Sequence, residues 1–154
     1  MIPRDRKVTY MKCVVDLRPQ KQEVERTRLV LGGDKVDYPF NVSTNTTDLD
    51  TTKIHFNSVI STPGARFMGL DLKDFYLGTI MKRYEYAKIK IDIIPMEIVT
   101  QYHLHEYVDQ QGYVNFEIRK GMYGLPQAGR LANEQLQEYL EPFGYTPTKR
   151  TPGL

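Results

Sequence analysis

A strictly alternating segment between Glu85 and Ile94 limits the possible folds more than any other part of the chain. Because successive side chains of a β-strand point to opposite faces, such a pattern predicts a strand with one face in the core and the other in water. The apolar residues are Ala87, Ile89, Ile91 and Ile93, and the polar ones are Tyr86, Lys88, Lys90 and Asp92. We therefore expect a sheet with one solvent-exposed face.

Further strands are predicted from β-branched and apolar segments bounded by glycine, proline and polar residues. They are Val8–Leu17, Val24–Leu31, Ala65–Leu70, and a strand that begins at Gly112 and places Val114, Phe116 and Ile118 on one face. The first two are separated by a short polar stretch, so they are expected to form a hairpin, which Gly32 and Gly33 close. The third is expected to be short and buried.

Three helices are predicted from periodic apolar residues and from start and stop signals. The first runs from Leu49 to Ile60, with Thr47 or Asp48 as its cap, and ends before Pro63. The second runs from Pro95 to about Tyr107 with Ile98, Val99 and Tyr102 facing inward, and the third carries the stripe Leu131, Ala132, Leu136, Tyr139 and Leu140 and ends at Pro142 and Gly144. Strands and helices together predict an α+β fold, with an antiparallel sheet and packed helices.

The composition is that of one folded globular domain, with 40% hydrophobic and 26% charged residues among 154. The single cysteine, Cys13, rules out an internal disulfide, and its apolar surroundings predict a buried side chain in a reducing, intracellular setting. No segment has the run of apolar residues that a membrane span needs, and the N-terminus lacks the apolar core of a signal peptide. We expect a soluble protein without a membrane partner.

Charge is unevenly distributed, although the net charge is only +2. Residues 1–31 carry eight Lys/Arg and four Asp/Glu, residues 32–118 carry eight and twelve, and residues 119–154 carry five and three. Basic flanks around an acidic centre suit a metal-dependent enzyme that acts on a phosphate backbone. An ordinary solvated surface explains the same distribution, and charge alone favours that interpretation.

Two motifs carry candidate chemistry. Asp71 follows the predicted strand Ala65–Leu70, and Tyr76 comes five residues later. A carboxylate at the end of a buried strand is placed to hold a divalent metal ion, although a turn or helix-cap aspartate is the simpler explanation of an isolated Asp71. The second motif, Tyr123–Gly129, is rich in glycine, follows Lys120 and precedes a predicted helix. A basic, glycine-rich segment before a helix is placed to contact a nucleotide.

Three segments occur in the order found in one polymerase family. Asp71–Leu77 reads Asp-Leu-Lys-Asp-Phe-Tyr-Leu, Lys120–Ala128 reads Lys-Gly-Met-Tyr-Gly-Leu-Pro-Gln-Ala, and Arg26–Gly33 reads Arg-Thr-Arg-Leu-Val-Leu-Gly-Gly. In this order they resemble the reverse transcriptase of copia-type retrotransposons, from about Val8 to Tyr145. The resemblance implies an RNA-directed DNA polymerase, which is a nucleotidyltransferase encoded within a pol polyprotein.

By this resemblance, the chain comprises the fingers and a partial palm of a right-hand polymerase. Residues 8–62 correspond to fingers, residues 63–145 to palm with fingers insertions, and residues 146–154 to a truncated tail. A chain of 154 residues is too short for complete fingers, palm and thumb, so we expect a fragment.

The resemblance also implies roles for single residues. Asp71 is expected to be the catalytic carboxylate and to bind Mg²⁺ or Mn²⁺, and Tyr76 to lie under the sugar of the incoming nucleotide, with a core position as its alternative. Gln127 is expected near the nucleotide and the template base, or simply in the first turn of a helix. Arg28 first, or else Lys12, is expected to contact the triphosphate. The candidate template–primer contacts are Lys120, Gly124 and Gly129, of which the glycines permit close backbone approach.

The chain departs from the family pattern in one respect. Such enzymes complete the metal site with a hairpin bearing two adjacent aspartates, but no Asp follows Asp109 here, and the later acids Glu134, Glu138 and Glu141 lie on a predicted helix. With one of three carboxylates, the chain alone is expected to bind its metal ions poorly and not to polymerise DNA. Asp74 matches a variable family position, and His103 and His105, two apart on a predicted helix, point to different sides, so all three stay outside the predicted site.

The expected partners are an RNA or DNA template–primer, deoxynucleoside triphosphates and the remainder of the pol polyprotein, in the cytoplasm within a virus-like particle if the element is active. Two other interpretations remain. One is the product of a decayed element that only binds nucleic acid, which the basic ends and eleven tyrosines permit. The other is an unrelated α+β interaction domain, which requires three ordered coincidences.

Overall fold

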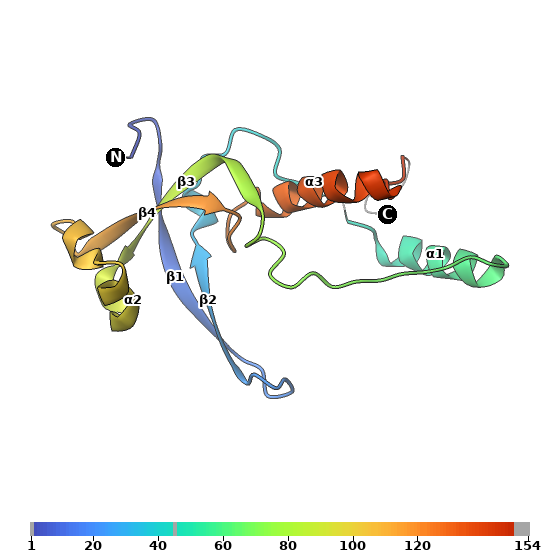
Figure 1. The fold of residues 1–154 in the computed structure, drawn as a ribbon, viewed down its shortest axis with the longest axis horizontal. Coiled ribbons are helices and arrows are strands. Elements are labelled where there is room, and N and C mark those ends of the chain that lie inside the picture. The colour runs from blue at the N-terminus through green and yellow to red at the C-terminus, as the bar shows by residue number, and fades with distance from the viewer. Residues whose placement is uncertain (1, 45, 150–154) are drawn as a thin grey trace.

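The computed structural model describes residues 2–44 and 46–149, which are organised around a four-stranded sheet. The strands are β1 (Val8–Leu17), β2 (Glu25–Leu31), β3 (Ile80–Lys90) and β4 (Tyr113–Lys120), in the order β2-β1-β3-β4 (Figure 1). The predicted β1–β2 hairpin is confirmed, and β3 and β4 are also antiparallel, but β1 and β3 are parallel. The α+β fold is confirmed, whereas a wholly antiparallel sheet is wrong, because the long connection from β2 to β3 acts as a crossover.

Two helices cover the same face of this sheet. The α-helices are α1 (Leu49–Ser61), α2 (Met96–Gln101) and α3 (Ala128–Leu140), and the short 3-10 helices are η1 (Gly33–Lys35), η2 (Ile91–Ile93), η3 (Leu104–Tyr107) and η4 (Glu141–Phe143). One core cluster joins Met81 and Ala87 of β3 to Ala128 of α3, and a second joins Val114 of β4 to Val99 of α2. All five side chains are 2% exposed or less. The predicted apolar face of β3 is therefore the covered face.

The helix α1 and residues 62–69 form an arm at the end of the molecule opposite α2 (Figure 1). No residue of this arm is buried. Its contacts are mostly its own: the rings of Phe56 and Phe67 meet edge to face with centroids 4.6 Å apart. Asp48, one of the two predicted caps, accepts the Thr51 backbone N–H at 2.8 Å. The arm is thus stabilised locally rather than by the core.

The segment Ala65–Leu70 is not the buried strand that its apolar side chains predicted. It is irregular and exposed along its whole length, and it joins no strand of the described sheet. Phe67 and Met68 are 52% and 62% exposed. A short apolar run becomes a strand only where a neighbour supplies backbone hydrogen bonds, and none of the four described strands pairs with this run.

The second predicted helix is shorter than expected. α2 ends at Gln101, and His103 adopts a left-handed backbone with φ 51°, after which the chain continues as η3. β3 likewise ends at Lys90, where the chain turns into η2 instead of continuing to Ile94. Both predictions were too long for the same reason: the apolar pattern continues past the residue where the backbone turns, and the pattern gives no sign of that turn.

Several side chains expected in the core lie at the surface. Val99 is buried as predicted, but Ile98 of the same helix and Tyr102 just after it are 40% and 59% exposed, and Tyr139 of α3 is 69% exposed. Cys13 is exposed rather than buried. Periodicity assigns residues to a face, but only a packed neighbour buries that face.

No helix within residues 2–44 and 46–149 has the length and apolar character needed to cross a membrane. Residues 146–149 of the expected tail are exposed and without helix or strand, and residues 150–154 lie outside the described part of the chain.

Candidate functional site

Asp71 lies in an irregular segment at the base of the arm, not at the end of a strand. The chain then turns sharply, because Asp74 has a left-handed backbone with φ 52° and its carbonyl accepts the Leu77 N–H at 2.9 Å. This turn returns Tyr76 to the sheet, where it is half-buried against the core cluster of α3. The first motif therefore leaves Asp71 exposed and anchors Tyr76.

Tyr123 brings predicted site residues together, although it was not itself predicted as one. Its ring lies 5.8 Å from that of Tyr76 in an edge-to-face arrangement, and the Arg28 guanidinium lies 5.9 Å from its centroid. The Tyr123 carbonyl accepts the Leu31 N–H at 2.8 Å, which fixes the motif against β2. The only sequence signal for this role was the position of Tyr123 at the start of the Tyr-Gly-Leu motif.

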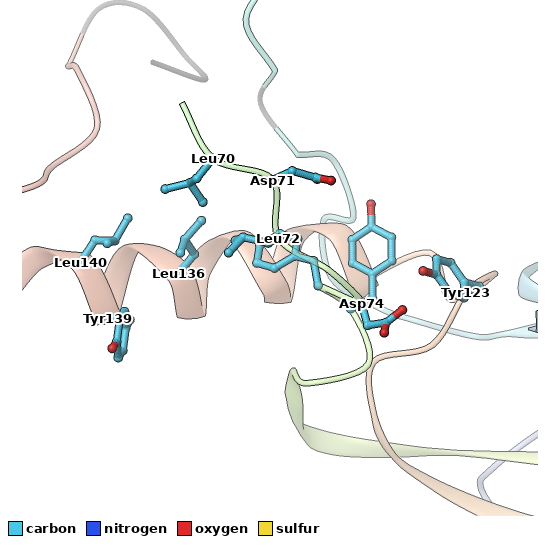
Figure 2. A pocket seen from close by; sticks show the side chains of 10 residues that line it. Leu70, Asp71, Leu72, Asp74, Tyr123, Leu136, Tyr139 and Leu140 are labelled. Atoms are coloured by element: carbon cyan, nitrogen blue, oxygen red, sulfur yellow. The ribbon is translucent and has the colours of Figure 1, made fainter. Parts of the chain in front are cut away.

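Two pockets meet at this point, and Asp71, Leu72, Asp74 and Tyr123 line both. The first, which we call the apolar groove, has a volume of about 710 Å³ and is also lined by Leu70, Phe75, Tyr76, Leu136, Tyr139 and Leu140. The second, the polar pocket, has a volume of about 630 Å³ and is also lined by Arg18, Glu23, Glu25, Arg26, Thr27 and Lys73. Figure 2 shows Leu136 and Leu140 pointing from α3 toward the segment that carries Asp71.

Of the two predicted triphosphate contacts, neither lines a pocket, but the Arg28 guanidinium lies over the Tyr123 ring. It forms an ion pair with Asp16 across the hairpin, and its Nε is buried without a hydrogen-bond partner in the described part of the chain. Lys12 is exposed on β1 opposite Val30 and lines neither pocket. The geometry therefore favours Arg28 over Lys12 for any ligand that rests on Tyr123.

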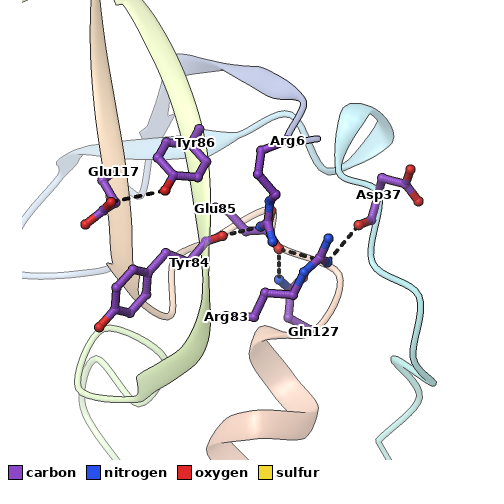
Figure 3. Close-up of polar contacts among 8 residues, drawn as sticks. All are labelled: Arg6, Asp37, Arg83, Tyr84, Glu85, Tyr86, Glu117 and Gln127. Atoms are coloured by element: carbon purple, nitrogen blue, oxygen red, sulfur yellow. Dashed lines mark hydrogen bonds and ion pairs between the residues drawn. The ribbon is translucent and has the colours of Figure 1, made fainter. Parts of the chain in front are cut away.

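Gln127 lies in a buried polar cluster and lines neither of the two pockets (Figure 3). Its side chain is 0% exposed, and its Nε2 donates to Glu85 Oε1 at 3.1 Å. The guanidinium groups of Arg6 and Arg83 lie 2.7 and 3.7 Å from the same carboxylate. The cluster joins β3, the start of α3 and the segment before β1. A contact between Gln127 and a nucleotide therefore requires the cluster to open.

Of the three candidate template–primer contacts, only Gly124 is required by packing within the chain. Gly124 has φ +92°, and a β-carbon there would lie 2.0 Å from the Leu31 carbonyl oxygen, so only glycine fits against β2. Gly129 lies beside Tyr76, whose hydroxyl would be 3.8 Å from an added β-carbon. Lys120 is exposed at the end of β4 and lines neither pocket.

The residues present do not make a site for Mg²⁺ or Mn²⁺. In the described ranges, no three His, Cys, Asp or Glu side chains gather closely enough to hold a metal ion. Asp71 and Asp74 line the same pockets, but hard divalent cations need several oxygen ligands in a fixed geometry. The part of the chain that the structure describes therefore shows no arrangement that could hold two metal ions.

The site therefore contains the rings of Tyr76 and Tyr123, the Arg28 guanidinium beside Tyr123, and the carboxylates of Asp71 and Asp74 in the two pockets. Such a set can hold a sugar and its phosphates, but the described residues form no cluster that could hold a metal ion. No protein-family model, curated protein or solved structure matches this chain. The likeness to a polymerase family therefore depends on the three ordered motifs.

Proposed function

We propose that this chain is the nucleotide-contacting part of a copia-type RNA-directed DNA polymerase, with fingers at residues 8–62 and palm at residues 63–145. One observation carries the proposal: all three motifs of the resemblance meet at Tyr123, although they are far apart in the sequence. Arg28 comes from the first, Tyr76 from the second and Tyr123 from the third. A chance set of motifs has no reason to converge on one ring.

In this proposal, the sugar of a deoxynucleoside triphosphate rests on Tyr76 and Tyr123, and its phosphates face Arg28. The bulk of Tyr76 excludes a 2′-hydroxyl. Asp71 supplies one carboxylate, and the others come from a different segment of the pol polyprotein. The chain by itself therefore binds substrates weakly and does not extend a primer.

Nucleotide binding is tested by titrating the isotopically labelled chain with dCTP and recording amide chemical shifts. We expect shifts in residues 71–79 and 121–124, with dCTP binding more tightly than CTP. Tyr76→Ala removes the preference for dCTP. Tyr102→Ala, which changes an exposed tyrosine just after α2, leaves the preference unchanged. Shifts confined to other regions contradict the proposed site.

A primer-extension assay tests the proposal that the chain by itself does not extend a primer. The purified chain with a template–primer, dNTPs and Mg²⁺ is expected to give no extension product. Extension that is abolished by Asp71→Asn would show that the site is complete, and would overturn the statement that further carboxylates are needed.

The second candidate is a product that only binds nucleic acid, and the incomplete metal site favours it. It predicts salt-sensitive binding of a template–primer together with no response to dCTP at residues 71–79. An unrelated interaction domain predicts neither binding of a template–primer nor a response to dCTP.

A further inference from the structure

The sheet has one covered face and one open face. On β3 the residues Met81, Ala87 and Ile89 are 5% exposed or less, because α2, α3 and their clusters lie over them. On the other side of the same strand, Tyr84 and Lys90 are exposed, and Tyr86 and Lys88 are half-buried. The described helices that pack on the sheet leave this second face uncovered.

Four tyrosines gather on the open face, and we call this surface the tyrosine face. Tyr84 and Tyr86 lie two residues apart on β3, so both point to the same side. The register places Tyr10 of β1 opposite Lys88, and Tyr113 of β4 opposite Lys90. Tyr10 and Tyr84 are 38% and 40% exposed. Rings from three adjacent strands therefore share one solvent-facing surface.

Cations lie between these rings. Lys88 Nζ is 4.5 Å from the centroid of the Tyr113 ring, Lys90 Nζ is 5.9 Å from it, and the Arg119 guanidinium is 5.6 Å from the Tyr84 ring. Glu117 on this face is paired with Arg119 at 2.6 Å, and among the ion pairs of the described residues none involves Lys88 or Lys90.

Hydrogen bonds hold two of the rings by their hydroxyl groups. The Tyr86 hydroxyl donates to Glu117 at 3.1 Å, and the Tyr10 hydroxyl donates to Asp34 at 3.0 Å. Burial first and Glu117 second raise the pKa of Tyr86, and the hydrogen bond to Asp34 raises the pKa of Tyr10. Both hydrogen bonds therefore fix the orientation of these rings at the surface.

We propose that the tyrosine face binds single-stranded nucleic acid, with bases stacked on Tyr84, Tyr86 and Tyr113. Stacking on aromatic rings combined with contacts from cations to the backbone is the general means of holding single strands. The bases of a duplex are already stacked on one another, so a duplex cannot use these rings. From Tyr84 to Lys90 the surface extends about 20 Å at the usual rise of a strand, which is enough for a few nucleotides.

This surface is separate from the pockets at Tyr123, because none of its residues lines either pocket. The inference therefore goes beyond the proposed polymerase function and does not depend on it. Loss of dCTP binding at residues 71–79 would leave it intact.

The test is fluorescence anisotropy of a labelled twelve-residue oligo-dT with the full chain, at several salt concentrations. Tyr84→Ala and Tyr113→Ala are each expected to weaken binding about tenfold, because each removes a stacking ring. Tyr84→Phe retains the ring and is expected to bind as the parent does. If the alanine variant unfolds, the phenylalanine variant still tests whether the ring rather than the hydroxyl group is needed. Lys90→Gln is expected to reduce the salt dependence.

The matched controls lie outside the tyrosine face. Tyr107 on η3 is 65% exposed, and the Lys53 side chain on α1 is 64% exposed, so Tyr107→Ala and Lys53→Gln remove the same groups elsewhere. Both are expected to leave affinity unchanged. Equal losses in the controls, equal affinity for a blunt duplex, or no binding of oligo-dT would each overturn the proposal.

Discussion

The sheet and the arm contain the same kinds of apolar residue, but they bury them very differently. Met81 and Ala87 in β3 are 1% and 0% exposed, whereas Ile54 and Ile60 in α1 are 70% and 84% exposed. Both segments have regular backbone structure. The difference shows that a helix forms from local signals, here the Asp48 cap, whereas burial needs a second element to pack against.

The largest expected effect concerns the buried polar cluster around Glu85. Because the sheet buries this cluster, loss of one of its side chains is expected to reduce stability strongly. Glu85→Ala removes the carboxylate that pairs with Arg6. The side chains of Arg6 and Glu85 are only 11% and 5% exposed, so the guanidinium would lose its partner in a nearly buried site. The expected loss is about 3–5 kcal/mol of unfolding free energy, as for other broken buried pairs, measured by urea denaturation. Glu117→Ala, at a more exposed ion pair of the same sheet, is the control and is expected to change little. A small effect of Glu85→Ala would mean that water already enters the cluster.

Truncation of one apolar side chain in each region compares them directly. Met81→Ala in β3 is expected to cost about 2–5 kcal/mol, because it leaves a cavity in the core. Ile60→Ala in the arm is expected to change stability by less than about 0.5 kcal/mol, because Ile60 is already in water. Similar losses in urea denaturation would contradict the description of the arm as unsupported.

Two glycines with positive φ sharpen the comparison. Gly64→Ala in the arm, at φ +77° with no atom within 4 Å, is expected to cost only the strain of a left-handed alanine, about 1 kcal/mol. Gly124→Ala adds a collision with the Leu31 carbonyl, so the loss is expected to be clearly larger. Thermal unfolding of both variants gives the difference. Equal effects would show that β2 and the Tyr123 motif separate easily.

The smallest expected effect is the pH dependence of the arm. Hydrogen bonds from the Thr51 backbone and then its hydroxyl lower the pKa of Asp48 below its usual value. The cap therefore stabilises α1 at and above the ordinary carboxyl pKa and is lost as pH falls through the lowered value. The protection factor of the Thr51 amide, which corrects for the intrinsic pH dependence of exchange, is expected to fall in that acidic range. Asp48→Asn, which keeps a capping acceptor, is expected to remove this pH dependence. A constant protection factor in the parent across that range would contradict the role of the cap.

Much of the fold was predictable because its signals are local. The alternation at Tyr86–Lys90, the hairpin, the Asp48 cap and the stop at Gly144 each depend on a few neighbouring residues. The failures at Ala65–Leu70 and at Tyr102 have one cause. An apolar pattern indicates which side chains prefer burial, but not whether another element lies within reach.

The candidate site divides in the same way. The motifs around Asp71 and Tyr123 were recognised as sequence, and the structure brings Tyr76 and Arg28 to one ring. It also places Gln127 in the core beside Glu85, which no local pattern indicated. Partners separated by forty residues become neighbours only when β3 and α3 pack.

The residue order by itself determined the hairpin, the two-faced strand β3, the helix α1 and the three motifs, because backbone geometry and short-range hydrogen bonds act over a few residues. Tertiary packing alone decided that β1 and β3 run parallel, that Gln127 is buried and that the arm is not. It also gathered the four tyrosines onto one open face. These outcomes depend on which distant segments meet, and apolar burial is non-directional, so composition and periodicity cannot choose among partners.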